Sequence, residues 1–132
     1  EEKMLYSLGG LMQLSNDIFD VYKDRESGVS TLVTTAVHIK DLRIYYTALL
    51  KTGRDAAFKS GYPKKNIREF MGLITLGIFS RCFVCFDQLG KNEKRTNHVF
   101  DLHAYSRKDL ICDMDTFSNK LKSLRYLFKL SK

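Results

Sequence analysis

The chain contains few of the residues that interrupt helices. Its 132 residues include one proline, Pro63, and eight glycines. Between them lie long segments in which apolar side chains recur at helical spacing, and the short β-branched segment 29–35 has no second strand to pair with. The sequence therefore predicts an all-α fold, a helical bundle of about four long helices that forms a single helical domain over residues 1–132.

Cysteines are also few, and no signal peptide is visible at the first residues. Three cysteines do not make a disulfide framework in a chain of this size, so we expect a reducing, cytoplasmic location. Cys82 and Cys85 form a C-x-x-C on an apolar stretch that has no second cysteine pair. We therefore expect both thiols to pack in the core and not to bind a metal.

A clear membrane span is missing as well. The most apolar run, residues 70–86, approaches the length of a membrane-spanning helix, but Arg81 lies inside it. A helix that is apolar on nearly every side is typical of the centre of a bundle. We expect a buried core helix here and no transmembrane segment.

Basic residues outnumber acidic ones. Lysine and arginine together number 22 against 15 aspartates and glutamates, which gives a net charge of +7 at pH 7. This balance suits an anionic partner. The basic residues are spread along the whole chain without a nucleic-acid-binding signature, so we expect no nucleic-acid partner.

One stretch, Q-L-S-N-D-I-F-D-V-Y-K-D, places polar groups on a single side of an otherwise apolar helix. Asn16, Asp20 and Asp24 are spaced i, i+4, i+8 and so share one stripe, with Gln13 and Asp17 beside it. Carboxylates this close repel unless a cation lies between them, and Mg²⁺ prefers such oxygen ligands. On spacing alone, a solvated acidic helix face is an equal alternative.

The letters of this stretch resemble the second metal-binding motif of the class I isoprenoid synthases. The squalene and phytoene synthase pattern Q-x-x-N-x-x-x-D-x-x-x-D is matched by Gln13, Asn16, Asp20 and Asp24. The terpene cyclase pattern N-D-x-x-S-x-x-x-E is similar to the same stretch, with Asp20 and Asp24 in place of the serine and the glutamate. Both registers use Asn16, Asp20 and Asp24 as metal ligands.

A third branch of the superfamily, the polyprenyl diphosphate synthases, matches in a different register. Its pattern G-x-x-F-Q-x-x-D-D-x-x-D aligns with Gly9, Gln13, Asp17 and Asp20, and the segment 24–32 resembles the D-x-x-x-G-K-x-T-L that follows in that branch. Val29 stands where those enzymes have the lysine. The resemblance is strong over residues 9–32 and extends to the remaining chain only in its helical character, and it leaves the branch open.

The resemblance implies a fold and a chemistry. The superfamily fold is a large helical bundle with two facing metal motifs, and the first of them, a D-D-x-x-D-like cluster, is not present in this sequence. We therefore expect the chain to be the C-terminal part of a longer synthase domain. Its expected partners are a prenyl diphosphate substrate and the missing N-terminal half, with a homodimer as a further candidate.

The resemblance also implies roles for individual residues. Asn16, Asp17, Asp20 and Asp24 are the candidate Mg²⁺ ligands, with Asp17 a ligand only in the polyprenyl register. Expected substrate-binding residues are Gln13, Lys23, Arg25, Arg125 and Tyr126, because basic residues flank the motif in the family and Arg125-Tyr126 resembles the R-Y pair with which terpene cyclases sense diphosphate. No protein nucleophile is required, because Mg²⁺ ionises the prenyl diphosphate.

Two other classes of function remain as alternatives. One is a non-catalytic helical binding module, or a degenerate synthase half, that binds lipid or a partner subunit. The other is a membrane-surface protein that uses the basic charge and the apolar run. The sequence shows no clean amphipathic helix rich in lysine and arginine, which disfavours the second class.

Apolar spacing and punctuation predict the helices. We expect helices over residues 3–25, 37–60 and 63–88, an exposed loop over 90–98, and a last helix that begins at a capping box formed by Ser106 and Asp109. His38 is expected in an ordinary polar or capping role. The last helix carries an apolar seam that we expect to pack along a neighbouring helix: Leu110, Met114, Phe117, Leu121, Leu124 and Phe128.

Overall fold

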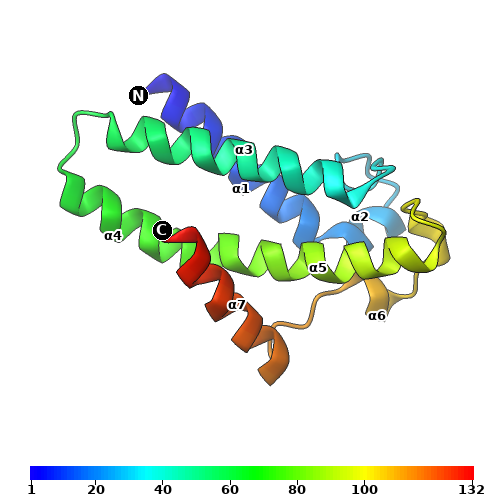
Figure 1. The fold of residues 1–132 in the computed structure, drawn as a ribbon. Coiled ribbons are helices and arrows are strands. Elements are labelled where there is room, and N and C mark those ends of the chain that lie inside the picture. Colours follow the sequence, from blue (N-terminus) through cyan, green and yellow to red (C-terminus); the bar gives the residue numbers. More distant parts are fainter.

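The structure, a computed structural model, describes all residues 1–132 and is all-α. Helices cover 73% of the chain and there are no strands, which confirms the predicted fold class. When the continuous segment Lys64–Arg95 is counted as one helix, there are six helices, four of them with seven or more residues, as expected for a bundle of about four long helices. Figure 1 shows how these helices are arranged.

The elements follow one another in the order α1 (Glu2–Phe19), α2 (Val21–Glu26), α3 (Ile39–Phe58), α4 (Lys64–Ile74), the π-helix η1 (Thr75–Phe79), α5 (Ser80–Arg95), the 3₁₀-helix η2 (Leu102–Ala104), α6 (Arg107–Leu110) and α7 (Phe117–Leu130). Helices α4, η1 and α5 form one long helical segment, and α3 runs beside it (Figure 1). Helix α1 packs mainly on α3, whereas α7 crosses α5 and η1.

The predicted first helix is interrupted at one residue. Asp20 separates α1 from α2 with φ −94° and ψ 8°. The helical hydrogen bonds nevertheless pass through this joint, because the Asp20 N–H donates to Asn16 O at 2.9 Å and the Asp24 N–H donates to Asp20 O at 2.8 Å. Helix α2 ends at Glu26, and Gly28, two residues later, has a φ of +66°, the left-handed conformation that glycine adopts without a steric penalty.

Tyr46 of α3 occupies the centre of the core and has no exposed surface. Its ring meets Phe79, Phe83 and Phe86 edge to face, with ring centroids 5.5 to 6.1 Å apart. Such pairs add roughly 0.5–1.5 kcal/mol each to the burial of the rings. The Tyr46 hydroxyl also lies 2.9 Å from Ser15 Oγ of α1, so this one side chain links α1, α3, η1 and α5.

The apolar run lies in the long segment Lys64–Arg95. By length and composition alone this segment could cross a membrane, and half of its most apolar window is buried inside the fold. On α5, the side chains of Cys82, Phe83, Val84, Cys85 and Phe86 are all buried. This part of the run is the core helix that the sequence predicts.

Helix α5 continues beyond the predicted end near residue 88. Residues 90–95, expected in an exposed loop, are helical, and that part of the prediction is wrong. Leu89 and Asn92 are buried, and Asn92 Nδ2 donates to Asp109 O at 2.7 Å. These contacts hold the charged end of α5 in a helix, and the chain turns only at Asn97 and His98, which both have positive φ.

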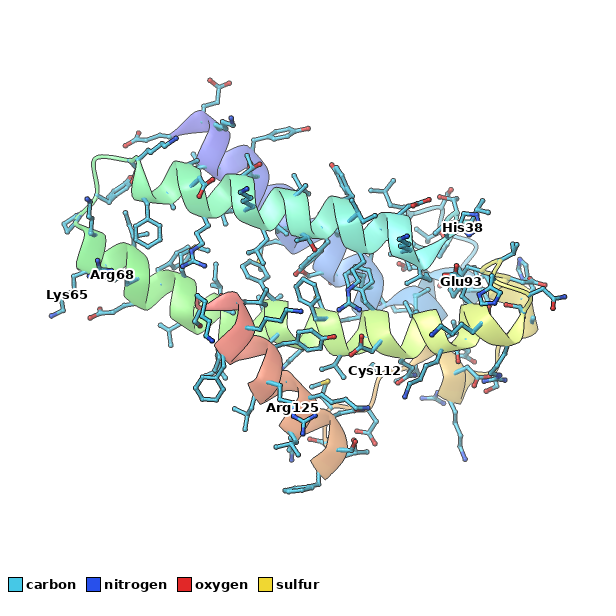
Figure 2. The ribbon with its side chains drawn as sticks, in the orientation of Figure 1. His38, Lys65, Arg68, Glu93, Cys112 and Arg125 are labelled. Carbon is cyan, nitrogen blue, oxygen red and sulfur yellow. The ribbon has the colours of Figure 1, made fainter.

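Glu93, in this unexpected part of α5, caps α3. Its Oε2 accepts a hydrogen bond from the Ile39 N–H at 2.8 Å, and its Oε1 lies 3.4 Å from His38 Nδ1. Figure 2 shows His38 and Glu93 side by side at this end of the molecule. His38 makes no side-chain cap of its own, so its role is that of a polar partner to the capping carboxylate.

The predicted last helix is two helices. Ser106 and Asp109 do form the capping box, but the helix that they begin, α6, ends at Leu110. Gln88 Nε2 donates to the carbonyl oxygens of Lys108, Asp109 and Ile111, the carbonyls that a continuing helix would need. Helix α7 then starts separately, with Thr116 Oγ1 accepting a hydrogen bond from the Asn119 N–H.

The apolar seam of the last helix faces outward. Phe117 is 82% exposed and Phe128 is 71% exposed, and Leu121 and Leu124 are also exposed. Helix α7 packs instead through Ser123, whose Oγ lies 2.8 Å from Ser80 Oγ, and through Tyr126, which stacks on Phe83. The expectation that this seam packs along a neighbouring helix is therefore wrong within this chain, and only its first residue, Leu110, is buried.

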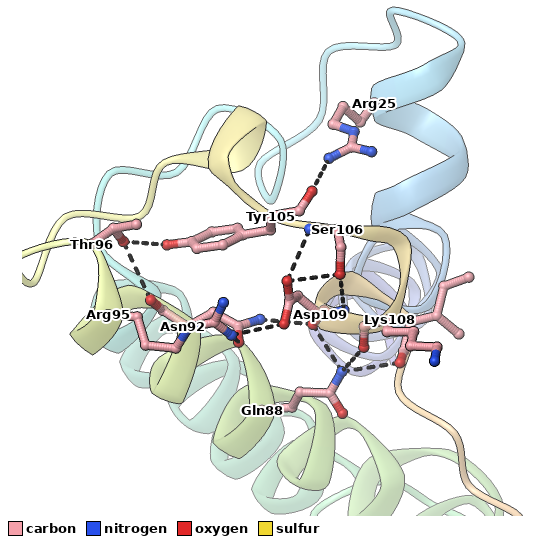
Figure 3. Close-up of polar contacts among 10 residues, drawn as sticks. Arg25, Gln88, Asn92, Arg95, Thr96, Tyr105, Ser106, Lys108 and Asp109 are labelled. Atoms are coloured by element: carbon pink, nitrogen blue, oxygen red, sulfur yellow. Dashed lines mark hydrogen bonds and ion pairs between the residues drawn. The ribbon is translucent and has the colours of Figure 1, made fainter.

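A polar cluster fastens residues 105–109 to α2 and α5 (Figure 3). Arg95 Nη1 lies 2.8 Å from Asp109 Oδ1, and the Ser106 N–H donates to Asp109 Oδ2 at 2.9 Å. On the other side, Arg25 Nη1 donates to Tyr105 O at 2.7 Å. The hydrogen bond from Arg95, followed by those from Ser106, lowers the pKa of Asp109 to about 2.

We expect Phe79→Ala to lower the free energy of unfolding by roughly 3–5 kcal/mol, because the substitution leaves a cavity against Tyr46. Phe128→Ala removes the same number of atoms from an exposed position and should change the free energy of unfolding by less than about 0.5 kcal/mol. Urea unfolding monitored by circular dichroism measures both values. Similar losses in the two variants would contradict the assignment of core and surface.

The lowered pKa of Asp109 predicts a pH dependence. A carboxyl whose pKa is lower in the folded state stabilises the fold above its ordinary value of 3.8 and loses that contribution as the pH falls toward about 2. Wild type should therefore lose more stability between these pH values than Asp109→Asn does. Urea midpoints across this range measure the difference, and parallel curves for the two proteins would contradict it.

Candidate functional site

The stripe Asn16, Asp20, Asp24 is present on the surface of α1 and α2. The unbroken helical hydrogen bonds from Asn16 through Asp20 to Asp24 keep the three residues about one turn apart on one side of the chain. The Asn16 side chain is exposed, and those of Asp20 and Asp24 are partly exposed. Asn16 and Asp24 make no side-chain hydrogen bond or ion pair, and Asp20 has only Lys23, 3.8 Å away.

Asp17 lies apart from this stripe. It is buried, and its Oδ1 accepts a hydrogen bond from Gln13 Nε2 at 2.8 Å. Gln13 and Asp17 are one turn apart, so they form a pair along a neighbouring stripe of α1. The structure therefore separates the residues that the sequence groups together, with Asn16, Asp20 and Asp24 in one set and Gln13 with Asp17 in another.

Lys23 and Arg25 have different surroundings. The Lys23 side chain is 75% exposed. Arg25 is largely buried: its Nη1 donates to the carbonyl oxygens of Leu102 and Tyr105, its Nη2 lies 3.0 Å from Glu26 Oε1, and its guanidinium lies over the Tyr22 ring. In this arrangement Arg25 holds the α2 end of the bundle together. Its carbonyl partners are distant in the sequence, so local motifs could not indicate this role.

Arg125 and Tyr126 are neighbours on α7, but their side chains have different surroundings. Arg125 is exposed and makes no ion pair (Figure 2). The Tyr126 hydroxyl donates to Asp87 Oδ2 at 2.8 Å and accepts a hydrogen bond from Arg43 Nη2 at 2.8 Å. Burial and the Asp87 carboxylate raise the pKa of Tyr126. The two residues lie on a helix that packs on α5 and η1, whereas the stripe lies on α1 and α2.

The chain alone does not surround a metal position. No three His, Cys, Asp or Glu side chains converge to hold a metal ion, and the stripe residues line none of the four main hollows of the surface. The stripe offers two carboxylates and one amide oxygen. A bound Mg²⁺ would therefore take its remaining oxygen ligands from water, from a substrate or from another part of the protein.

Apolar side chains surround the stripe on the outer face of α1. Gly9 and Asn16 lie on this face, and a Cβ added at Gly9 would meet no atom within 4 Å, so packing inside the chain does not explain that glycine. The exposed apolar residues of the same face are Leu5, Tyr6, Met12 and Phe19. A polar stripe within an uncovered apolar surface is typical of a binding face.

The three cysteines gather in and beside α5. Cys82 and Cys85 are free and buried, as expected for core residues. Burial raises the pKa of Cys82 to about 11, and the neighbouring Cys112 thiol, together with burial, raises the pKa of Cys85. Cys112, in the linker between α6 and α7, is only partly buried, and its interaction with Cys85 lowers its pKa. The sequence gives no sign of this contact because Cys112 is far from the C-x-x-C.

Comparisons with known proteins add no family to these observations. No family model matches the chain, and neither the curated proteins nor the solved structures contain a match. The function is therefore argued from the side chains and surfaces described above.

We expect iodoacetamide to modify Cys112 first under native conditions, because its pKa is lowered and its side chain is partly exposed, whereas Cys82 and Cys85 are buried. Mass spectrometry of tryptic peptides gives the order of labelling. In Cys112→Ser, rapid labelling should disappear, and all remaining thiols should react in denaturant. Equal rates of labelling at the three cysteines would contradict the burial of Cys82 and Cys85 and the partial exposure of Cys112.

Proposed function

We propose that the chain supplies the second metal-binding motif of a class I isoprenoid synthase, in which Mg²⁺-dependent binding and ionisation of a prenyl diphosphate take place. One observation supports this most strongly. Asn16, Asp20 and Asp24 keep a continuous helical register, carry no competing partner except Lys23, and lie on an apolar helix face. The all-α fold, with four long helices, is compatible with the C-terminal half of such a synthase.

The chemistry of the donor set fits Mg²⁺. A bound Mg²⁺ would neutralise the diphosphate leaving group as the allylic cation forms. The Asp20 and Asp24 carboxylates would hold it, and the Asn16 amide oxygen would serve as a third ligand. Lys23 is exposed enough to turn from Asp20 toward an anion, whereas the Arg25 guanidinium already serves two carbonyl groups and Glu26.

The apolar side chains beside the stripe would form part of the cavity wall. Met12 and Phe19 flank Asn16 on the exposed side of α1. Gly9, on the same face, has no side chain and so leaves this surface open for a ligand. An apolar wall keeps water away from an allylic cation. The opposite wall would come from the N-terminal half of the longer enzyme, which would carry the facing metal motif.

The position of Asp17 favours one register over the other. In the polyprenyl register Asp17 is a metal ligand, yet its carboxylate is buried and bonded to Gln13. In the squalene, phytoene and cyclase registers the ligands are Asn16, Asp20 and Asp24, which share the exposed stripe. We therefore favour a branch that uses the second set, with the Gln13–Asp17 pair in a supporting role.

A second candidate function is a helical module that binds a partner without catalysis. The observation in its favour is that the chain by itself brings no three acidic or histidine side chains together. In that case, the outer face of α1 would bind a protein or lipid partner through its apolar side chains, and the aspartates would remain solvated.

We expect MgCl₂ with inorganic diphosphate to raise the Tm of the wild-type chain by several degrees, because a ligand at about 100 times its Kd stabilises a fold by about 2.7 kcal/mol. Differential scanning fluorimetry measures this shift. Asp20→Asn should reduce it strongly, because a neutral amide replaces a charged carboxylate ligand. Asp115→Asn, at a position that is 99% exposed, should retain it.

A further variant tests the register. Asp17→Asn should keep the shift if the ligands are Asn16, Asp20 and Asp24, and it should lose the shift if the polyprenyl register applies. A wild-type chain with no shift in MgCl₂ and diphosphate would favour the non-catalytic module. Equal shifts in wild type and Asp20→Asn would place the anion elsewhere and contradict the proposed ligand set.

A further inference from the structure

Helix α7 presents its most apolar side to the exterior. The α7 ridge consists of Phe117, Leu121, Leu124 and Phe128, whose spacing of four, three and four residues places them on one stripe. The two phenylalanines at its ends are 82% and 71% exposed. Side chains this apolar are usually placed against a core, so the ridge is an unpartnered surface.

The opposite side of α7 explains why the ridge faces outward. The helix is fixed to the bundle by the Ser123–Ser80 hydroxyl contact, by the Tyr126–Phe83 stack and by the bond between Tyr126 and Asp87. These contacts fix the rotation of α7 about its axis. Turning the ridge inward would break all of them and expose Ser80, which is fully buried.

The apolar surface continues from α7 onto the neighbouring helix. Leu76 of η1 and Leu124 of α7 line one hollow, and its charged residues are Arg81, Lys120 and Asp115. Leu73, in the preceding turn of α4, is 70% exposed. The ridge therefore belongs to a broader apolar surface that includes Leu73 and Leu76, with Arg81 and Lys120 beside it.

The charges on α7 itself have one sign. Helix α7 contains Lys120, Lys122, Arg125 and Lys129 and no acidic residue. Arg125, Lys122 and Lys129 make no ion pair, and Lys120 has only a contact of 4.0 Å with the fully exposed Asp115. An apolar stripe with lysine and arginine on its flanks is the pattern of helices that lie in the plane of a membrane interface, so α7 corrects the expectation that the chain has no amphipathic helix rich in basic residues.

Positive charge extends from α7 to the adjoining surface. Lys122 shares a hollow of about 500 Å³ with Lys40, Lys91 and Lys94. The two carboxylates of that hollow are already engaged, since Asp87 is bound to Arg43 and Tyr126, and Glu93 caps α3. The unpaired lysines leave this side of the molecule able to attract an anionic surface.

We propose that the α7 ridge docks on the surface of an anionic phospholipid bilayer. Helix α7 lies in the plane of the interface, with Phe117, Leu121, Leu124 and Phe128 among the acyl chains. Lys122, Arg125 and Lys129 contact lipid phosphates on one flank, and Lys120 does so on the other. The membrane is favoured over a protein partner because the ridge protrudes, its end residues are nearly fully exposed, and every charge on the helix is basic.

This inference is independent of the proposed prenyl diphosphate site. The stripe on α1 and α2 carries carboxylates, and the helix that carries the ridge has none. Vesicle binding needs neither Mg²⁺ nor diphosphate, so either proposal can fail while the other stands.

Vesicle cosedimentation with the 132-residue chain tests the docking. We expect the chain to bind vesicles of phosphatidylcholine with phosphatidylglycerol, to bind those of phosphatidylcholine alone much more weakly, and to be released by high salt. The double variant Phe117→Ser, Phe128→Ser should lower binding roughly tenfold or more, because it removes the two most exposed apolar groups. The double variant Arg125→Gln, Lys129→Gln should lower it roughly fivefold for each charge removed.

A control replaces two exposed apolar residues on another helix. Ile44 and Tyr45 of α3 are 57% and 47% exposed, and the double variant Ile44→Ser, Tyr45→Ser should bind anionic vesicles as wild type does. Circular dichroism checks that each variant is folded. None of the substituted side chains is buried, so loss of fold is not expected.

Several outcomes would overturn the proposal. One is the absence of binding to anionic vesicles, and another is equal binding by wild type and by the double phenylalanine variant. Self-association in sedimentation equilibrium that this variant abolishes, without vesicle binding, would identify a second copy as the occupant of the ridge. Binding that withstands high salt and alkaline carbonate would indicate insertion of the segment Lys64–Arg95 and would also overturn surface docking.

Discussion

The burial of Tyr46 is the interaction on which the rest of the structure depends. Its ring meets three phenylalanines of η1 and α5, and its hydroxyl reaches Ser15 of α1. A buried hydroxyl without a hydrogen-bond partner would cost free energy. The Tyr46 hydroxyl therefore favours the rotation of α1 that brings Ser15 toward it. With Ser15, Leu14 and Ile18 turned inward, Asn16, about 100° round the helix from Ser15, lies on the exposed side. The hydrogen bond in the core is thus one of the contacts that orient the candidate metal stripe.

Two uncovered surfaces of different character lie on helices that both pack against α5, namely α1 and α7. The outer face of α1 combines apolar side chains with the Asn16, Asp20, Asp24 stripe, and the α7 ridge combines apolar side chains with basic residues. Polar contacts set both orientations, because Ser15 meets Tyr46 on one side and Ser123 meets Ser80 on the other. Buried hydroxyl pairs have definite geometry, whereas apolar contacts tolerate rotation. The two surfaces therefore suit partners of different charge.

Sequence reasoning was most successful where the determining contacts are local. The helices of residues 3–25 and 37–60, the glycine stop at Gly28 and the Ser106–Asp109 capping box depend on neighbours within a few residues. It failed for residues 90–95 and for the last helix. Buried Asn92 keeps the charged end of α5 helical, and Gln88 binds the carbonyls at which α6 ends. These side chains act on residues of another element, so periodicity could not predict their effect.

By itself, the sequence determined the fold class, the positions of most long helices and the spacing that aligns Asn16, Asp20 and Asp24, because helical periodicity and turn chemistry are properties of short segments. Only the tertiary structure decided which side of each helix is covered. It turned Asp17 toward Gln13, committed Arg25 to the carbonyls of residues 102 and 105, and left the apolar seam of α7 exposed. Whether a helix face is covered depends on which hydroxyl, ring or carbonyl from a distant part of the chain contacts it. Amphipathic spacing predicts that a helix has an apolar face, but it does not predict which element packs against that face.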